Sequence, residues 1–394
     1  MLNTPFSPWP SFTEQEISAV SEVLRSNKVN YWTGQEGKNF EKEFAQFCDS
    51  QYAIAVANGT LALDLALQIL DIKSGDEVIV TSRTFIASIS SIINAGATPV
   101  FADVELDSQN ISAETINAVL SEKTKAIMCV HLAGWPCEMD DIMSLAEQHN
   151  LLVIEDCAQA HGTKYKGRPV GSIGHVGAWS FCQDKIMTTG GEGGMLTTND
   201  EKLWRKGWAY KDHGKSYAAV YEKQHPAGFR WLHESFGTNW RLTEMQSAIG
   251  RIQLTRMPKW KKSRNDNAEK IRQICKKYNW LIVPNIPEYI EHAFYKCYVH
   301  IDLEQLPKNY SRDIIINEIT QLGVPCFSGS CSEVYKEKAF KNTNFIPENA
   351  LPNAHLLGEN SLMFLVHPTL TSDEMHKCCQ ALNSVFDSID QLIK

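Results

Sequence analysis

Residues 179–196, WSFCQDKIMTTGGEGGML, combine the end of a strand, a single lysine and a glycine-rich turn. The apolar run at 178–182 predicts the strand, and the run GGEGG at 190–194 lets the chain turn tightly beside a ligand. Lys185 lies between the two, so we expect its amine to project from a strand end into a crevice. A lysine in a partly dry crevice can act as the nucleophile of Schiff-base chemistry, whereas a lysine without this context is a surface residue.

The glycine run does not have the context of a dinucleotide-binding fingerprint. That fingerprint must open a helix, but the next residues, MLTT at 195–198, have the composition of a strand. A hydride-transfer enzyme is therefore not indicated.

Short apolar runs alternate with helical patterns through the first half of the chain. Strands are predicted at 52–57, 77–81, 98–104, 126–132 and 151–155, and helices at 60–70, 85–94, 112–120 and 138–149. This alternation predicts an α/β fold with a mostly parallel sheet between helices. Ligands of such sheets lie at the carboxyl ends of the strands.

Asp156 closes one of these strands, in the run IEDCAQAHG at 154–162. A carboxylate among apolar neighbours needs a cationic partner, and the protonated nitrogen of a pyridine ring would be one. Gln159 lies close by and could bond a phenolic oxygen on the same ring. Considered alone, Asp156 could instead cap the next turn, and Gln159 could be a simple loop amide.

Gly59 and Thr60 begin a buried helix directly after a strand, where free N–H groups and the positive helix end favour a phosphate. Ser180 could add a hydroxyl to the same phosphate. Phe85, at another junction of strand and helix, could stack on a flat ring. Taken singly, Gly59 and Thr60 are a weak signal, because such residues also start helices for structural reasons, and Ser180 and Phe85 fit a core or capping role better than a binding role.

The composition narrows the class of protein. The 394 residues carry a formal net charge of −8, so no global positive field favours nucleic acid or an acidic membrane surface. The 11 cysteines show no C-x-x-C spacing, which predicts reduced thiols and a cytoplasmic protein. We expect neither a signal peptide nor a membrane span, and no metal site, since H-E-x-x-H is absent.

A long helical stretch at 244–278 is expected to break at Pro258. Its charged residues predict a solvated helix face rather than a nucleic-acid surface. These residues are Lys259, Lys261, Lys262 and Arg264.

The chain beyond this stretch has the pattern of a smaller domain. Strand-like runs at 295–302 and 361–367 predict an α+β arrangement. We expect a large cofactor-binding α/β domain at 1–253 and a small C-terminal α+β domain at 254–394.

Taken together, these segments resemble the DegT/DnrJ/EryC1/StrS family of pyridoxal-phosphate (PLP) dependent nucleotide-sugar aminotransferases, which have the fold type I architecture. The resemblance covers essentially the whole chain. The ordered set of motifs is specific, although each motif alone is not. The motifs are YWTGQEGKNFEKEF, ANGTLALDLAL, TSRTFIAS, IEDCAQAHG, SFCQDKIMTTGGEGGM, KDHGK, GTNWRLTEMQSAIG and FLVHPTLTSDEM.

The resemblance implies a role for each matching residue. Lys185 would form the Schiff base with PLP, Asp156 would pair with the pyridine nitrogen and Gln159 would bond the ring hydroxyl. Phe85 would stack on the ring. The phosphate would be bound by Gly59, Thr60 and Ser180, and by Asn239 of a neighbouring subunit.

A shared phosphate site implies a homodimer. A related branch that dehydrates keto sugars carries His at the position of Lys185, so the lysine favours amino transfer. The region FSGSCSEVYKEKAF at 327–340 departs from the His-containing loop of many members, which leaves the substrate contacts of the small domain open.

The expected reaction moves an amino group from L-glutamate to a nucleotide-linked keto sugar. The leading expectation is C4 of a UDP-4-keto-6-deoxy-N-acetylhexosamine, for a surface polysaccharide such as lipopolysaccharide. A dTDP-linked 4-keto-6-deoxyhexose or a 3-keto nucleotide sugar remains open. His213, Arg230 and Arg241 are candidate contacts to substrate or pyrophosphate, although salt bridging or surface exposure would explain each equally well.

Overall fold

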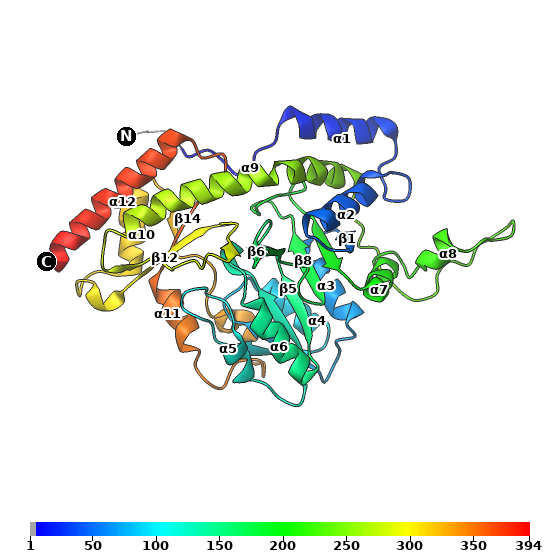
Figure 1. Cartoon of the computed structure of the whole chain (residues 1–394), viewed down its shortest axis with the longest axis horizontal. Coiled ribbons are helices and arrows are strands. Elements are labelled where there is room, and N and C mark those ends of the chain that lie inside the picture. The colour runs from blue at the N-terminus through cyan, green and yellow to red at the C-terminus, as the bar shows by residue number, and fades with distance from the viewer. Residues whose placement is uncertain (1–4) are drawn as a thin grey trace.

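A seven-stranded sheet forms the centre of the larger part of the molecule in the computed structural model, which describes residues 5–394 (Figure 1). The strands lie in the order β1-β9-β8-β5-β4-β2-β3. The strands from β8 to β3 are parallel, and β9 pairs antiparallel with both β1 and β8. Their bounds are Tyr52–Val56 (β1), Glu77–Thr81 (β2), Thr98–Ala102 (β3), Thr124–Val130 (β4), Leu152–Asp156 (β5), Val176–Ser180 (β8) and Gly194–Thr198 (β9).

The expected α/β fold with a mostly parallel sheet is confirmed. Every residue of β8 and β9 is buried. Because successive side chains of a strand point to opposite faces, this burial means that both faces of the sheet are covered. That is why these strands read as continuous apolar runs in the sequence.

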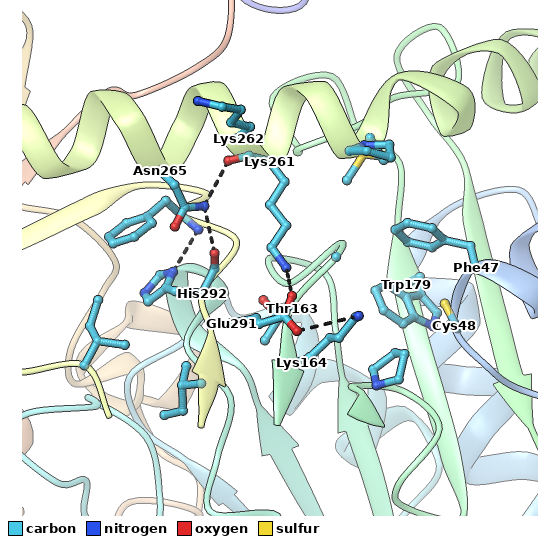
Figure 2. A pocket seen from close by; sticks show the side chains of 17 residues that line it. Phe47, Cys48, Thr163, Lys164, Trp179, Lys261, Lys262, Asn265, Glu291 and His292 are labelled. Carbon is cyan, nitrogen blue, oxygen red and sulfur yellow. Dashed lines mark hydrogen bonds and ion pairs between the residues drawn. The ribbon is translucent and has the colours of Figure 1, made fainter. Parts of the chain in front are cut away.

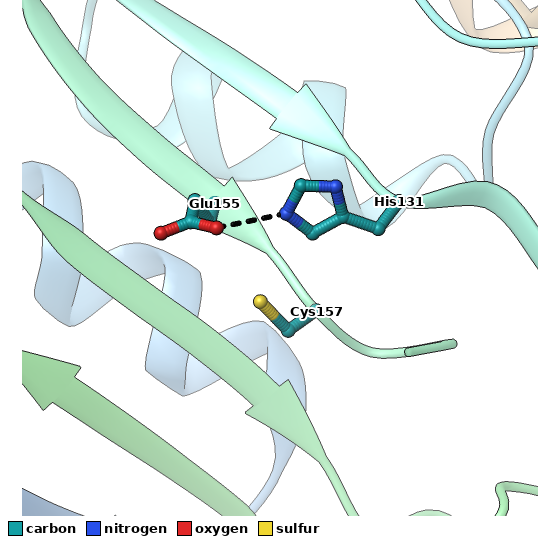
Figure 3. A group of neighbouring side chains, drawn as sticks. All are labelled: His131, Glu155 and Cys157. Atoms are coloured by element: carbon teal, nitrogen blue, oxygen red, sulfur yellow. Dashed lines mark hydrogen bonds and ion pairs between the residues drawn. The ribbon is translucent and has the colours of Figure 1, made fainter. Parts of the chain in front are cut away.

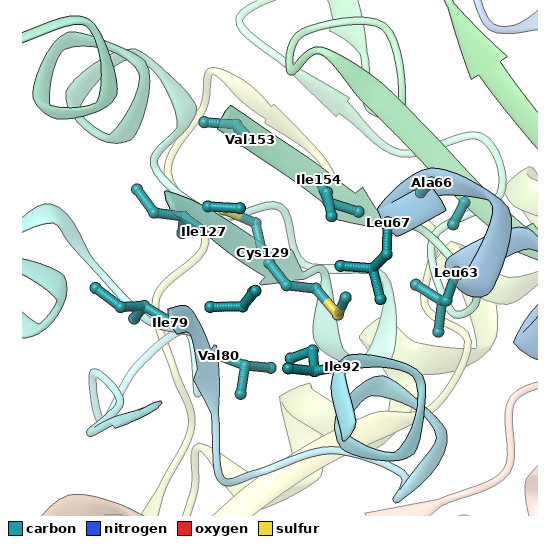
Figure 4. Packing of buried hydrophobic residues seen from close by; sticks show 14 of the residues in the cluster. Leu63, Ala66, Leu67, Ile79, Val80, Ile92, Ile127, Cys129, Val153 and Ile154 are labelled. Atoms are coloured by element: carbon teal, nitrogen blue, oxygen red, sulfur yellow. The ribbon is translucent and has the colours of Figure 1, made fainter. Parts of the chain in front are cut away.

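Two helices pack on the sheet close to the strand ends that carry the site. Figure 4 shows Leu63 and Leu67 of α3 (Gly59–Ile69) and Ile92 of α4 (Ala87–Asn94) packed with Val80 and Ile154 of the strands. Both helices begin directly beyond strand ends. Their first turns therefore lie at the carboxyl edge of the sheet, where parallel sheets hold their ligands.

A second sheet lies in the C-terminal part of the chain. It has four antiparallel strands in the order β10-β12-β14-β13, with bounds Leu281–Ile282, Cys297–Ile301, Ser361–Phe364 and Cys326–Phe327. The helices α10 (Arg312–Gln321) and α12 (Ser372–Ile393) bury apolar residues in a core of their own with this sheet. This part has the α+β composition that the sequence predicts.

The helix α9 (Glu244–Cys275) is continuous, so the expected break at Pro258 was wrong. The proline removes one backbone hydrogen bond, but ion pairs hold the helix before it and apolar packing of Ala268 and Ile271 holds it after. Arg251 pairs with Glu43, and Arg256 pairs with the buried Glu16.

The helix α9 contacts both parts of the molecule. Its first half contacts α1 (Glu14–Ser26) and α2 (Glu36–Phe47), and its last turns join the core of the C-terminal part. Residues 253 and 254 both lie inside it. The division of the chain at this point stays a prediction.

The charged run on α9 is only partly solvated. Lys259 and Lys262 are exposed, but Arg264 is buried, with 1% of the residue exposed. The expectation of a solvated face was therefore wrong for Arg264. Arg264 faces inward because it lies four residues after the buried Trp260, on the same side of the helix.

The remaining elements are short or peripheral. Their bounds are Ala113–Asn117 (α5), Met139–His149 (α6), Lys164–Tyr165 (β6), Arg168–Pro169 (β7), Glu201–Lys211 (α7), Tyr217–Tyr221 (α8), Ile290–Glu291 (β11) and Pro352–Asn360 (α11). Among residues 5–394, no helix combines the length and the apolar character that crossing a bilayer requires. All 11 cysteines are unpaired thiols.

Glu244 joins the start of α9 to the start of α2, which explains the motif YWTGQEG. Its carboxylate accepts the backbone N–H groups of Glu36 at 2.6 Å and Gly37 at 3.1 Å. A Cβ at Gly34 would overlap this carboxylate, so only glycine fits there. The carboxylate supplies the cap that the first turn of α2 otherwise lacks.

We predict that Glu244→Ala lowers the free energy of unfolding by about 1–3 kcal/mol, because a buried and a partly buried N–H group lose their acceptor. Glu244→Gln keeps an acceptor oxygen and should lose less. Denaturant unfolding measures both, and the exposed Glu14→Ala serves as the matched control. A Glu244→Ala protein as stable as that control would contradict this role.

Candidate active site

Lys185 follows β8 in a turn that is fastened at both ends. Its backbone N–H donates to the carbonyl of Cys182 at 3.1 Å, and its own carbonyl accepts the indole N–H of Trp9 at 2.7 Å. Its amine lies 5.2 Å from the ring centre of Tyr295. The turn therefore holds the amine between the large sheet and Tyr295 of the C-terminal part.

Two adjoining cavities, of 640 Å³ and 470 Å³, meet at Lys185. The first lies over the carboxyl edge of the large sheet and includes Asp156. The second is lined mainly by the C-terminal part. The residues that line both are Thr84, Phe85, Gln159, Asp184 and Lys185.

Asp156 ends β5 at the wall of the first cavity, as the sequence predicts. One carboxylate oxygen accepts the hydroxyl of Ser88 at 2.8 Å, and the other accepts the N–H of Ala158 at 3.1 Å. Burial raises the pKa of Asp156, although these donors and the charge of Lys185 act in the opposite direction. A cation placed against it in the cavity would stabilise its ionised form.

The neighbouring residue Glu155 fixes β5 from the other face of the sheet. Figure 3 shows its hydrogen bond of 3.0 Å with His131. The backbone N–H groups of Gly171 and Gly174 also donate to it. Burial alone would raise the pKa of Glu155, but His131 and these N–H groups outweigh burial and lower it. Glu155 therefore anchors the strand whose next residue is Asp156.

His131, Glu155 and Cys157 lie close enough to one another to suggest a metal site. The Nδ1 of His131 accepts the N–H of Cys137, so its Nε2 carries the proton that Glu155 accepts. Neither nitrogen keeps a free lone pair. Burial also raises the pKa of Cys157, which keeps its thiol protonated. The cluster is thus a hydrogen-bonded support for β5.

Gln159 reaches both cavities. Its side-chain oxygen accepts the N–H of Ala133 at 2.9 Å, which leaves its NH₂ group as a donor. Ala133 has a φ of 56°, so the backbone is shaped to make this contact. A donor at this point suits a phenolic oxygen.

The first turn of α3 and Ser180 form a small polar cradle at the far end of the first cavity. Asn58 caps the helix by accepting the N–H of Leu61, which leaves the N–H groups of Gly59 and Thr60 free of partners within the helix. A Cβ at Gly59 would lie 2.5 Å from the Cβ of Ser180. Glycine is therefore required for the helix end and the hydroxyl to converge on one anion.

Phe85 is an apolar side chain that is left open in the wall of both cavities, with 67% of the residue exposed. A ring in this position can stack on a flat ligand.

Four expected site residues do not line either cavity of their own chain. His213 and Arg230 are exposed, as is Asn239. Arg241 forms an ion pair with Asp212 at 2.6 Å. The backbone of Asp212 also pairs with that of Asn239 in an isolated antiparallel β-bridge. Their binding roles remain predictions.

A larger hollow of 760 Å³ lies on the other side of Trp179 (Figure 2). Lys164 and Lys261 line it, and both pair with Glu291, at 3.6 Å and 2.7 Å. The two lysines share this one carboxylate, and Lys185 does not reach this hollow. We therefore assign the chemistry to the two cavities that meet at Lys185.

The structure adds residues that sequence reasoning missed. Ser88, which bonds Asp156, belongs to the motif TSRTFIAS, where its place one helical turn after Thr84 could have indicated it. Tyr295 and Lys296 line the second cavity, as do residues of the segment 329–337. No local pattern marks these residues, because only the fold brings them to Lys185.

The comparison with known proteins agrees with this geometry. The model of the DegT/DnrJ/EryC1/StrS aminotransferase family matches residues 10–383. The chain belongs to this family.

Three relatives of this aminotransferase illustrate the match. GDP-perosamine synthase of Caulobacter vibrioides is 35% identical over 387 residues, covering 94% of this chain and 98% of that protein. The dTDP-3-amino-3,6-dideoxy-alpha-D-galactopyranose transaminase of Aneurinibacillus thermoaerophilus is 32% identical over 379 residues, covering 94% and 95%. The crystal structure of an aminotransferase from Psychrobacter cryohalolentis is 67% identical, with a TM-score of 0.97, covering 98% of this chain and 100% of that chain.

The chain is thus a PLP-dependent nucleotide-sugar aminotransferase. The residues of the first cavity fit PLP in three respects. The buried Asp156 makes no ion pair among residues 5–394, the NH₂ group of Gln159 is free to donate, and the cradle at Gly59 admits a phosphate but would be filled by a Cβ.

We predict that Gly59→Ala weakens PLP binding by about 10- to 100-fold, the equivalent of a charge-assisted hydrogen bond or more. The added methyl group would push the helix end away from Ser180. Equilibrium titration of the apoenzyme with PLP measures the change, and thermal unfolding checks that the fold is kept. Unchanged PLP affinity in a folded Gly59→Ala protein would rule out this cradle as the phosphate site.

Proposed function

We propose that this aminotransferase transfers the amino group of L-glutamate to C4 of a UDP-4-keto-6-deoxy-N-acetylhexosamine. The observation that carries the proposal is the position of the Lys185 amine, where the cavity of Asp156 meets a separate cavity lined by the C-terminal part. One amine can then serve both the cofactor end and a substrate held beyond it.

In this proposal the side chains of the first cavity hold PLP. Asp156 faces the ring nitrogen, Gln159 donates to the ring hydroxyl and Phe85 covers one face of the ring. The phosphate binds to the cradle of Gly59, Thr60 and Ser180, together with Asn239 of a second subunit.

Bound PLP supplies an electron-accepting ring for the amino transfer. Asp156 keeps the ring nitrogen protonated through its negative charge. The Nζ of Lys185 takes a proton from the Cα of the amino donor as a general base, and later delivers a proton to C4 of the sugar as a general acid. Since both substrates use the same amine in turn, we expect ping-pong kinetics.

The second cavity is suited to a sugar. Its wall combines aromatic side chains, Tyr298 and Phe327, with small polar residues such as Ser330. Carbohydrates present apolar faces and hydroxyl groups, and this mixture can contact both. Phe327 and Ser330 belong to the region 327–340, where the sequence departs from the more usual loop of the family, and Tyr298 comes from β12.

The nucleotide and the keto position are the least determined features of the proposal. Relatives are named for GDP-linked and dTDP-linked sugars, and one is named for spore coat polysaccharide biosynthesis. A dTDP-linked 4-keto-6-deoxyhexose or a 3-keto nucleotide sugar is the alternative substrate. We propose that the amino sugar enters a surface polysaccharide such as lipopolysaccharide, after synthesis in the cytoplasm.

We also propose a homodimer with shared active sites. The segment after α8 extends away from the rest of the molecule (Figure 1) and exposes Phe229, Trp231 and Phe236 by 78%, 84% and 99%. Such aromatic exposure is typical of a protein contact surface. Asn239 follows on the same segment, which would bring it to the phosphate of the partner. A sedimentation mass of a single chain would contradict the dimer.

We predict that Lys185→Ala abolishes turnover while the protein still binds PLP, because the amine that moves the proton is lost. Asp156→Asn should lower the rate by about 10²- to 10³-fold with the fold intact, because the ring nitrogen loses its ionic partner. Steady-state rates with glutamate measure both effects, and Lys164→Ala in the separate hollow is the control. Normal rates in Lys185→Ala would refute the mechanism.

A substrate panel tests the choice of sugar. We expect the highest kcat/KM for the UDP-linked 4-keto sugar among UDP-, dTDP- and GDP-linked 3-keto and 4-keto sugars, with product NMR showing an amine at C4. A clear preference for another nucleotide or for C3 would replace the proposed substrate with that sugar. Failure of every keto sugar, with glutamate still consumed, would reject the sugar half of the proposal.

A further inference from the structure

Arg264 carries a buried guanidinium group with unused hydrogen-bond donors. Its Nη1 donates only long hydrogen bonds, of 3.4 Å and 3.3 Å, to the carbonyls of Phe294 and Tyr295. Its Nε and Nη2 have no hydrogen-bond partner among residues 5–394. Burial lowers the pKa of Arg264 to about 9. Since buried polar groups in folded proteins are nearly always paired, the side chain lacks an anionic partner.

A cavity of 300 Å³ lies against this guanidinium group. Residues 6–9 of the N-terminal segment form one wall of it, and the indole of Trp9 lies 5.1 Å from the guanidinium carbon. The same indole donates its N–H to the carbonyl of Lys185. The cavity is thus built into the support of the catalytic lysine.

Lys296 lines this cavity and also the cavity that contains Lys185. Within residues 5–394 it makes no ion pair, and residues 1–4 contain no carboxylate side chain. Burial lowers the pKa of Lys296 to about 8; the charge of Asp184 acts in the opposite direction, and the nearby Arg264 and Lys185 add to the lowering. Two cations therefore face one cavity.

The other titratable groups around the cavity compensate this positive charge only in part. Asp184 is the only carboxylate in its described wall; burial would raise its pKa, but Lys185, the hydroxyl of Tyr295 and Lys296 lower it, so its charge offsets one of the two cations. His367 is neutral at ordinary pH, because burial and the two cations lower its pKa to about 4. The wall therefore favours an anion.

We propose that Arg264 and Lys296 bind the side-chain carboxylate of the dicarboxylic amino donor and of its 2-oxo acid product. This inference rests on the proposed use of L-glutamate as the donor. Arg264 can offer two parallel N–H groups to a carboxylate, and Lys296 can add an ammonium group. Both residues then set the choice of amino donor.

The position of the 300 Å³ cavity indicates which of the two carboxylates of glutamate it binds. The cavity shares Asp184, Tyr295, Lys296 and Leu365 with the cavity of Lys185, but Lys185 does not line it. The α-carboxylate is attached to the carbon from which Lys185 takes a proton, so it must stay beside that amine. The more distant carboxylate of glutamate fits the separate cavity.

The test compares two amino donors in the first half-reaction of the holoenzyme, followed by the absorbance of the cofactor. L-Glutamate carries the side-chain carboxylate and L-alanine lacks it. We expect Lys296→Met and Arg264→Gln each to lower kcat/KM for glutamate by about 10- to 100-fold, the effect of losing a charge-assisted hydrogen bond. The value for alanine should stay unchanged.

Lys262→Met, an exposed lysine on the same helix as Arg264, is the matched control and should alter neither donor. Calorimetry with glutarate gives a second readout that needs no turnover: the wild-type protein should bind it more tightly than butyrate, and Lys296→Met should remove the difference. If Arg264→Gln does not fold, Lys296→Met carries the test alone.

Three results would overturn the inference. Equal losses for glutamate and alanine would show a general structural role. An increase only in the KM for the nucleotide sugar would assign the cations to its diphosphate. A wild-type enzyme that does not prefer glutamate would reject the proposed donor itself, and this result is visible before any variant is made.

Discussion

The uncompensated charge of Asp156 is the constraint on which the rest of the site depends. Ser88 and Ala158 satisfy its two oxygens, but neither supplies positive charge. Glu155, on the opposite face of the same strand, is held by His131 and by the turn at 171–174. The carboxylate therefore cannot move to find a cation, and the cation must come to it as part of a ligand. The cavity over the strand end, which both Asp156 and Lys185 line, is where such a ligand can bind.

A second buried charge connects the cofactor end to the sugar end. Arg83, in the loop after β2, donates to Gln109 in the large part and to Ser332 and Ser361 in the C-terminal part. In the part of the chain that the structure describes it has no carboxylate partner, and burial lowers its pKa. Arg83 has a structural role: its hydrogen bonds hold the loop that carries Phe85 against the segment that lines the second cavity. These hydrogen bonds therefore help to fix the positions of the two cavities relative to each other.

The sequence predicted what local pattern can encode. The strands of the large sheet were predicted within two residues, because their continuous apolar runs match strands buried on both faces. The predicted strand at 361–367 ends earlier, at Phe364, and the two-residue strands of the chain were not predicted. Asp156 and Lys185 were predictable as polar residues at strand ends. Arg264 was not: its neighbours Lys259 and Lys262 are exposed, and only packing against the C-terminal part turns it inward. Lys296 likewise reaches Lys185 across 111 positions of sequence through tertiary contact alone.

The continuity of α9 explains how such distant groups meet. The helix is held by ion pairs to α1 and α2 at one end and by apolar packing with α12 at the other, so it continues through Pro258 despite the lost hydrogen bond. Arg264 lies past the proline, where the helix passes beside the N-terminal Trp9. Trp9 also donates its indole N–H to the carbonyl of Lys185, so one indole contacts both the buried guanidinium and the turn of the catalytic lysine. The proposed site for the donor carboxylate therefore lies beside the support of the reacting amine.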